Sequence, residues 1–390
     1  MTRLLIVNAG SSSTRLTVLG PDDEVEEHLH LPPPGNDDTD AALDALVARA
    51  RPQASVHRIV HGGPWFAGAV LADASTEERL RMLADLAPLH VPPSLQLLDR
   101  VRDAMPGHPA VACFDTGFFA GLPDEAATYP LPTEWRVAWS IRRYGFHGLS
   151  HAWVAGRLDQ VLPPAAAHGR VVSAHLGAGA SLAALDDGRP LDTTMGFTPL
   201  DGLVMATRPG SVDPGILLHL LRVGEVTLDQ LEDGLEHHSG LVALAGNADL
   251  ERVIARAASG DATASLAYRV LLHRLRAGIA SMAAALGGID GLVFTGGAGE
   301  ASGTLRSDTC GGLGFLGVGV DERANRGLRG EGLISSGGPV AVAVVTARED
   351  LEMARQARAL VAAAGGGPAA SPRVTRRGVS RRWRSRRPRG

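Results

Sequence analysis

Short apolar runs along the chain alternate with longer segments in which apolar residues recur every three or four positions. The runs predict buried strands, and the longer segments predict amphipathic or alanine-rich helices. Strands are expected at Leu4–Val7, Val111–Phe114, Val171–His175, Leu292–Thr295 and Val340–Val345. Helices are expected at Asp40–Arg49, Glu78–Leu86, Ser94–Met105, His151–Leu158, Pro214–Leu221, Leu228–Leu235, Thr263–Leu286 and Glu349–Ala363. This mixture indicates an α/β protein.

One pattern occurs twice, at an offset of 167 residues. Leu4–Leu19 reads LLIVNAGSSSTRLTVL and Val171–Leu185 reads VVSAHLGAGASLAAL. Each predicts a strand, a polar side chain (Asn8 or His175), a Gly- and Ser-rich turn and a second strand. Such a turn lets backbone N–H groups converge on an anion, because few side chains block the approach. The repetition favours two similar halves that hold a phosphate chain, although an ordinary structural turn stays open for each hairpin taken alone.

Composition narrows the class of protein. A length of 390 residues allows two or three domains, and 45% hydrophobic with 21% charged residues is typical of a globular chain. No apolar run is long enough to span a bilayer and no signal peptide is recognisable, so a cytoplasmic protein without membrane contact is expected. The chain has only two cysteines, Cys113 and Cys310, which is too few for a disulfide framework. We expect both to be core residues. All 38 basic residues are arginine, which excludes a P-loop or Schiff-base lysine.

Charge is unevenly distributed, because residues 373–389 hold nine arginines and no acid. The glycine run Gly365–Gly367 precedes this stretch, and the apolar periodicity ends there. We therefore expect residues 365–390 to form a disordered, solvated tail. Nucleic-acid binding through the arginines is the less favoured alternative.

Between the two hairpins and beyond them, arginine, histidine and aspartate are concentrated beside glycine and proline. The segments are HRIVHGG (His57–Gly63), LAPLH (Leu86–His90), CFDTGFF (Cys113–Phe119), RRYGFHGLSH (Arg142–His151) and Leu191–Gly210. Phosphoryl transfer to a small acid needs cations that neutralise charge on both reactants. In a chain without lysine, Arg58 and Arg208 are the candidates. Asp115 follows a predicted strand directly, where sites of α/β proteins form.

In order and spacing, eight motifs resemble the acetokinase family of the actin-like, sugar kinase and heat-shock ATPase superfamily, across roughly residues 3–363. They are NAGSSS (Asn8–Ser13), HRIVHGG, FDTGF (Phe114–Phe118), RRYGFHG (Arg142–Gly148), HLGAGAS (His175–Ser181), DTTMGFTPLDGLVMATR (Asp192–Arg208), Asp213–Pro214 and FTGGAGE (Phe294–Glu300). The resemblance implies an α/β fold of two duplicated ribonuclease H-like (actin-like ATPase) domains with a cleft between them. The implied domains are residues 1–147 completed by the final helix 349–364, then 148–348, then the tail.

The resemblance also implies an activity, the reversible transfer of the ATP γ-phosphoryl group to acetate, giving acetyl phosphate and ADP, with propionate as a further acceptor. A homodimer that uses Mg²⁺ or Mn²⁺ is implied as well. Catalytic roles would belong to Arg58, Asp115, His147 and Arg208, of which His147 and Arg208 would stabilise the transition state. Arg58, Val60, Leu89, Phe146 and Pro199 would bind the acyl substrate. Asn8, Ser11, Ser13, Arg15, His175, Gly177, Gly179, Asp249, Gly297 and Gly299 would bind the nucleotide and its phosphates, with His90 near them, and Asn8 and Glu349 would hold the metal.

Several positions depart from the family pattern, mostly around the nucleotide. Arg15 stands where the family has Lys, Ala178 and Ala301 where it has Asn, and Glu251 where it has Arg. The other departures are Pro64, Val91, Phe119 and Ala206. They leave open a kinase with another donor (pyrophosphate) or another acyl group, and a non-catalytic nucleotide-binding relative.

Overall fold

The computed structural model describes residues 2–9, 13–85 and 91–365. Its chain divides into two compact units. The first unit comprises Met1–Phe114, Asp124–Arg143 and Met353–Gly390, and the second comprises Asp115–Pro123 and Tyr144–Glu352. Ser11, Leu89, His90 and residues 366–390, for which expectations were stated above, lie outside the described residues.

The first unit is built on a six-stranded sheet of order β3-β2-β1-β4-β6-β5. Its elements are β1 (Leu4–Ala9), β2 (Thr14–Leu19), β3 (Val25–Leu31), α1 (Asp37–Ala50), β4 (Ala54–Ile59), β5 (Val70–Leu71), α2 (Ala74–Met82), the 3₁₀ turn Leu83–Asp85, α3 (Val91–Ala104), β6 (Ala110–Phe114), α4 (Asp124–Ala127) and α5 (Thr133–Ala138). The last helix, α17 (Glu349–Gly365), begins in the second unit and enters the first at Met353.

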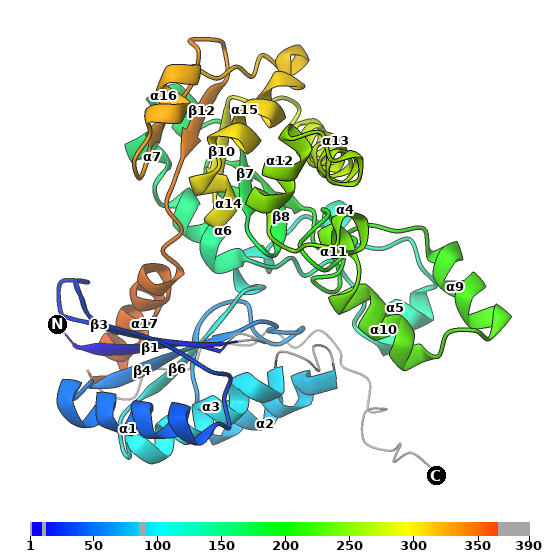
Figure 1. Ribbon diagram of the computed structural model, residues 1–390. Coiled ribbons are helices and arrows are strands. Elements are labelled where there is room, and N and C mark those ends of the chain that lie inside the picture. The colour runs from blue at the N-terminus through cyan, green and yellow to red at the C-terminus, as the bar shows by residue number, and fades with distance from the viewer. Residues whose placement is uncertain (1, 10–12, 86–90, 366–390) are drawn as a thin grey trace. The chain divides into compact units, whose positions relative to one another are not determined.

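Side-chain alternation along the strands supplies the core of the first unit. Leu5 and Val7 of β1 pack in one buried cluster with Leu43 of α1 and Leu97 of α3. In Figure 1, α1 and α3 lie along one face of this sheet and α17 along the other. On the α17 side the buried Cys113 thiol donates to the Met353 carbonyl oxygen over 3.9 Å.

The second unit contains a sheet of order β11-β12-β10-β7-β8-β9. Its elements are the 3₁₀ turn Gly117–Phe119, α6 (Gly148–Ala155), α7 (Leu158–Val161), α8 (Pro164–Ala167), β7 (Arg170–Leu176), β8 (Ala180–Asp186), β9 (Arg189–Thr193), α9 (Pro214–Val223), α10 (Leu228–His237), α11 (Gly240–Ala245), α12 (Leu250–Ala258), α13 (Ala262–Ala285), β10 (Gly291–Thr295), α14 (Gly297–Ala301), α15 (Gly303–Gly311), the 3₁₀ turn Gly314–Leu316, α16 (Glu322–Gly327), β11 (Gly332–Leu333) and β12 (Ala341–Val344).

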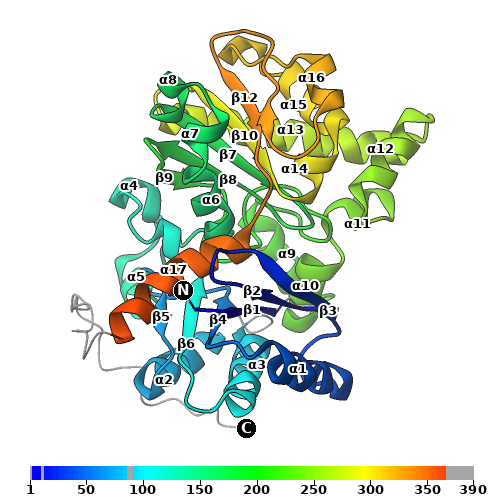
Figure 2. The same ribbon diagram turned by 90° about the vertical axis from the view of Figure 1, so that its left-hand side faces the viewer.

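Helices cover both faces of this second sheet, whose strands β10, β7 and β8 lie side by side in Figure 2. Ser173 of β7 bonds to a side chain of α6, so α6 covers the face on which Ser173 lies. A Cβ on Gly278 of α13 would meet the Leu182 side chain at 2.9 Å, so α13 lies on the other face.

The two sheets repeat the same connectivity. β1 pairs antiparallel with β2 and parallel with β4, just as β7 pairs antiparallel with β8 and parallel with β10. β4 then pairs parallel with β6, as β10 does with β12. The predicted α/β class and the duplication are therefore confirmed. The repeat comprises all six strands of each sheet and not only the hairpin seen in the sequence.

The five strands predicted singly are all present, and so is the second strand of each predicted hairpin, β2 and β8. β4 was missed, because Ser55, His57 and Arg58 interrupt its apolar pattern. All eight predicted helices are present with shifted ends. The expected helix Glu78–Leu86 begins at Ala74 and ends at Met82, and α6 begins three residues before His151.

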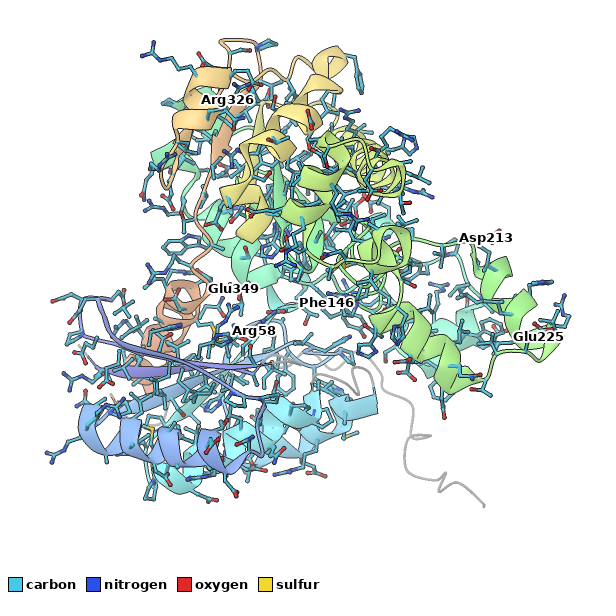
Figure 3. The ribbon with its side chains drawn as sticks, viewed as in Figure 1. Arg58, Phe146, Asp213, Glu225, Arg326 and Glu349 are labelled. Carbon is cyan, nitrogen blue, oxygen red and sulfur yellow. The ribbon has the colours of Figure 1, made fainter. Side chains whose placement is uncertain are left out.

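Other expectations have mixed outcomes. Asp213 caps α9 by accepting from the Gly215 N–H, and the helix begins at Pro214 as predicted (Figure 3). Within the motif Phe294–Glu300, residues Gly297–Ala301 form the short helix α14, which was not among the predicted helices. Cys113 and Cys310 are buried free thiols, as expected of core residues. Among the described residues, no helix combines the length and apolar character needed to cross a bilayer.

Candidate active site

Asn8 and Arg58 are brought together in the first unit by adjacent parallel strands, β1 and β4. The Arg58 Nη1 donates to Asn8 Oδ1 over 3.1 Å. Both residues are partly exposed, whereas their neighbours Val7 and Ile59 are buried. The strands therefore present a guanidinium and an amide near the carboxyl ends of the strands, where ligands of α/β proteins bind.

Other expected ligands of the first unit lie close by in sequence and register. Arg15 of β2 is the register partner of Asn8, so the two side chains emerge on the same face of the sheet. Ser13 directly precedes β2. Val60 directly follows β4 and is buried, with 7% of its surface exposed.

In the second unit, Asp115 lies against the N-terminus of α6. The Gly148 N–H donates to the Asp115 carbonyl oxygen over 2.8 Å. A Cβ on Gly148 would lie 2.0 Å from that oxygen, so only glycine permits this approach. His147 precedes Gly148 in the left-handed conformation, with φ of 56°. Asp115 is 1% exposed, and the turn therefore fixes His147 beside a buried carboxylate residue.

His147 and His175 form a pair of rings in the second unit. Their centroids are 4.4 Å apart and their planes are inclined by 30°. His147 Nδ1 is hydrogen-bonded to Ser181 Oγ at 3.0 Å, and His175 Nδ1 is hydrogen-bonded to Ser150 Oγ at 2.8 Å. Each ring is thus held by its Nδ1 atom, which leaves its Nε2 edge for other contacts.

Arg208 reaches the same place from the segment after β9. Its Nη1 donates to the Pro199 carbonyl oxygen over 2.9 Å, so two predicted site residues meet. A Cβ on Gly179 would lie 2.9 Å from Arg208 Nη2 and 3.0 Å from His147 Nε2. Burial lowers the pKa of Arg208, and the Glu236 carboxylate opposes that shift. An anion beside Gly179 would therefore meet a guanidinium with little competing water and an imidazole edge.

A cavity of about 300 Å³ opens next to this cluster within the second unit. Gly177, Asp249 and Gly297 line it, together with apolar side chains from α11, α13 and α15. Three departures from the family pattern, Ala178, Ala206 and Glu251, also line it. Asp249 caps α12, because its carboxylate accepts from the N–H groups of Glu251 and Arg252. The cavity has the size and the apolar wall expected of a site for a ring system.

The remaining predicted residues lie elsewhere. Gly299 is buried in α14 and does not line the cavity; its carbonyl oxygen accepts from Arg306. Phe146 is fully buried and Pro199 is buried. Glu349 is the first residue of α17, as Figure 3 shows.

Sequence reasoning quoted Ser150, His151 and Ser181 within motifs without giving them a role. Both His151 nitrogens are hydrogen-bonded, Nδ1 to Ser173 Oγ and Nε2 to Ser181 Oγ, each at 2.9 Å. The available signal was the clustering of His147, Ser150 and His151 within one short motif, Arg142–His151.

A divalent cation can be assessed from the chemistry of its expected donors. Asn8 and Glu349 offer an amide and a carboxylate oxygen, the hard donors that Mg²⁺ prefers. No group of three or more His, Cys, Asp or Glu side chains suited to a metal occurs in residues 2–9, 13–85 and 91–365. Each of the two oxygens fits a hard divalent cation such as Mg²⁺.

Comparisons of the sequence and of the structure with known proteins all point to one family. The sequence model of the acetokinase family matches residues 45–355. The acetate kinase of Trichormus variabilis is 44% identical over 302 residues, which are 77% of this chain and 74% of that protein. The crystal structure of Porphyromonas gingivalis acetate kinase aligns with a TM-score of 0.84 at 31% identity, over 93% of this chain and 100% of that one. A propionate kinase from Francisella tularensis aligns with a TM-score of 0.85 at 32% identity, over 91% and 99%. The chain belongs to the acetokinase family.

Proposed function

We propose that the protein catalyses the acetate kinase reaction, ATP + acetate ⇌ ADP + acetyl phosphate, with propionate as a second acceptor. Membership of the acetokinase family supports the reaction class. The single observation that carries the proposal is the approach of Arg208 and His147 to Gly179, because it provides a cation and an imidazole for one anion.

In the forward reaction an acetate oxygen attacks the γ-phosphorus. A new O–P bond forms, the bond from the γ-phosphorus to the β,γ-bridging oxygen breaks, and its electron pair leaves with ADP. Charge gathers on the phosphoryl oxygens in the transition state, so positioned cations and N–H donors lower the barrier. Arg58 and Arg208 supply the cations, His147 supplies an N–H, and Asp115 orients the reacting groups.

The acyl group is proposed to bind against Val60, Phe146 and Pro199, with Leu89 as the fourth member of the set. The three described residues are buried, which suits the burial of a methyl or ethyl group. Arg58 would pair with the carboxylate, because a guanidinium matches its two oxygens. Butyrate is expected to be a poor acceptor.

The nucleotide is proposed to place its base in the cavity lined by Gly177, Asp249 and Gly297. Asn8, Ser11, Ser13, Arg15, His175 and Gly179 are the proposed phosphate-side ligands. The apolar wall of the cavity favours ATP over pyrophosphate, since pyrophosphate carries no group to bury there. Mg²⁺ or Mn²⁺ would bind with the nucleotide through Asn8 and Glu349, and it would neutralise phosphate charge.

The proposal includes the duplicated domain organisation, residues 1–147 completed by the final helix 349–364, and then 148–348. Arg358 of α17 supports the assignment of that helix, because its guanidinium donates to the carbonyl oxygens of Thr2 and Gly20. We place the protein in the cytoplasm, where ATP is abundant and where buried free thiols such as Cys113 stay reduced.

A homodimer is part of the proposal, and the surface of the second unit supports it. No described residue of α9 or α10 is buried. Ile216, Leu218 and Leu228 are 53%, 59% and 67% exposed, which is unusual for large apolar side chains on amphipathic helices. Sedimentation should give a dimer for the wild type and a shift toward monomer for the double variant Ile216→Glu, Leu218→Glu.

The test is an assay of acyl phosphate, trapped with hydroxylamine, from Mg·ATP and acetate, propionate or butyrate. Product should depend on the acid and disappear in Arg208→Ala. Arg326→Ala is the matched control, because Arg326 is an exposed arginine of the same unit with a 79% exposed side chain. If the wild type makes product only with pyrophosphate, pyrophosphate and not ATP is the phosphoryl donor. If it makes no product with either donor, the protein is not an acyl kinase.

A further inference from the structure

Ser173, His151 and Ser181 connect the core of the second unit to His147. Ser173 Oγ contacts His151 Nδ1, His151 Nε2 contacts Ser181 Oγ, and Ser181 Oγ contacts His147 Nδ1, at 2.9, 2.9 and 3.0 Å. The two serines and His151 have no exposed surface. Phe119 covers His151, with ring centroids 5.8 Å apart. Four side chains thus form one continuous chain of hydrogen bonds, which is buried except at the partly exposed His147.

The direction of the hydrogen bond between Ser173 and His151 follows from which atom must supply the proton. Among the described residues, Ser173 Oγ has a single hydrogen-bond partner, His151 Nδ1. If His151 donated from Nδ1, the Ser173 proton would be buried without an acceptor, which is costly. Ser173 therefore donates, and His151 Nδ1 accepts.

The remaining bonds follow from the first. Burial lowers the pKa of His151 well below its ordinary value, so the ring is neutral and carries its one proton on Nε2. His151 Nε2–H donates to Ser181 Oγ. The Ser181 proton then has one acceptor among the described residues, His147 Nδ1. His147 is left with its own proton on Nε2, the edge near Gly179 and Arg208.

We propose that Ser173, His151 and Ser181 are positioning residues that fix His147 as the neutral tautomer protonated at Nε2, a proposal that rests on the proposed phosphoryl-transfer function. A phosphoryl oxygen can only accept, so the tautomer decides whether His147 can donate to it without becoming charged. His175 stacks on the His147 ring and Arg208 faces the same Gly179 position, and a second positive charge beside the Arg208 guanidinium would be unfavourable.

The tautomers can be measured directly in the wild type. Two-bond ¹H–¹⁵N correlation spectra of the full chain labelled with [¹⁵N]histidine distinguish protonation at Nε2 from protonation at Nδ1. His147→Gln and His151→Gln spectra assign the two resonances. Both residues should be protonated at Nε2 across about pH 6–8. Protonation of either ring at Nδ1 would overturn the proposal.

A kinetic test uses Ser173→Ala, whose side chain contacts neither His147 nor Arg208 in the described residues. Loss of this bond frees His151 to change tautomer, so kcat should fall about ten-fold while the KM values change by less than about two-fold. Ser173→Thr keeps the hydroxyl and should recover kcat. The matched control is Ser55→Ala, which removes a buried Ser–His bond of 2.9 Å in the first unit and should keep the wild-type kcat.

The outcomes separate this inference from the proposed function. A wild type that forms no acyl phosphate would refute the function, and the spectra would still decide the tautomer. An active wild type whose kcat and His147 tautomer are unchanged in folded Ser173→Ala would refute the positioning role. If Ser173→Ala does not fold, the wild-type spectra alone decide.

Discussion

The Arg58 guanidinium donates a hydrogen bond to the Asn8 amide oxygen over 3.1 Å, and the two residues lie on adjacent parallel strands. A long arginine side chain held in this way loses less rotational freedom when it binds an anion. The contact therefore links a residue expected to bind the carboxylate with one expected to bind phosphate and metal.

Arg58→Ala should lower kcat/KM for acetate about a thousand-fold, because it removes a cation from a charged transition state. Arg58→Lys should recover only part of the activity, since lysine cannot pair with a carboxylate through two N–H groups. Steady-state kinetics of the acyl hydroxamate assay gives the values. Arg81→Ala, which changes a 57% exposed arginine of the same unit, should be neutral, and an active Arg58→Ala would contradict the assignment.

Gly179→Ala should lower kcat without unfolding the protein. The added Cβ would lie 2.9 Å from Arg208 Nη2 and 3.0 Å from His147 Nε2, so both side chains must move. A displacement of this kind costs about a hundred-fold in rate. Gly234→Ala is the control, because a Cβ there meets nothing within 4 Å. Equal kcat values for the two variants would show that the Gly179 edge is not used.

Gly148→Ala should destabilise the protein, since its Cβ would lie 2.0 Å from the Asp115 carbonyl oxygen. The backbone of the α6 N-terminus must shift, and we expect a loss of about 2–4 kcal/mol in the free energy of unfolding. Urea denaturation measures this loss. A stability equal to that of the wild type would mean that the turn accepts a side chain.

Ala178→Asn should strengthen ATP binding, because Ala178 lines the cavity and stands where the family has Asn. An amide that bonds to a charged phosphate contributes about 1.5–3 kcal/mol, so the Kd for ATP should fall at least about ten-fold. Isothermal titration calorimetry measures the Kd. Ala257→Asn on α12, outside the cavity lining, is the control; a Kd unchanged in Ala178→Asn would remove this position from the nucleotide site.

Stability should fall as the pH drops below about 6.5, the ordinary pKa of histidine. Burial lowers the pKa of His57 to about 3 in the folded state. Between about pH 6.5 and pH 3, His57 is therefore protonated in the unfolded chain but not in the folded chain. His57 should contribute a loss of about 2 kcal/mol between about pH 7.5 and pH 5. Urea midpoints of His57→Asn should decline less over this range than those of the wild type, and parallel declines would contradict the assignment.

Much of the fold was readable from local pattern. Leu4–Val7 and Leu292–Phe294 are continuous apolar runs, and such short runs favour buried strands. β4 was not readable, because its Ser55 and His57 are polar in sequence yet bond to each other in the buried interior. α14 was not predicted, since its glycines, Gly297 and Gly299, disfavour a helix.

The sequence by itself determined the family, the duplicated hairpins and the residue types available for phosphoryl transfer, because these depend on composition, order and spacing. Tertiary structure alone decided which side chains meet. His147 and Ser181 are 34 residues apart in the chain. They come into contact only because α6 packs on the face of the sheet on which Ser173 lies. A hydrogen-bond direction depends on burial and on the absence of competing partners, and neither is encoded in a local pattern.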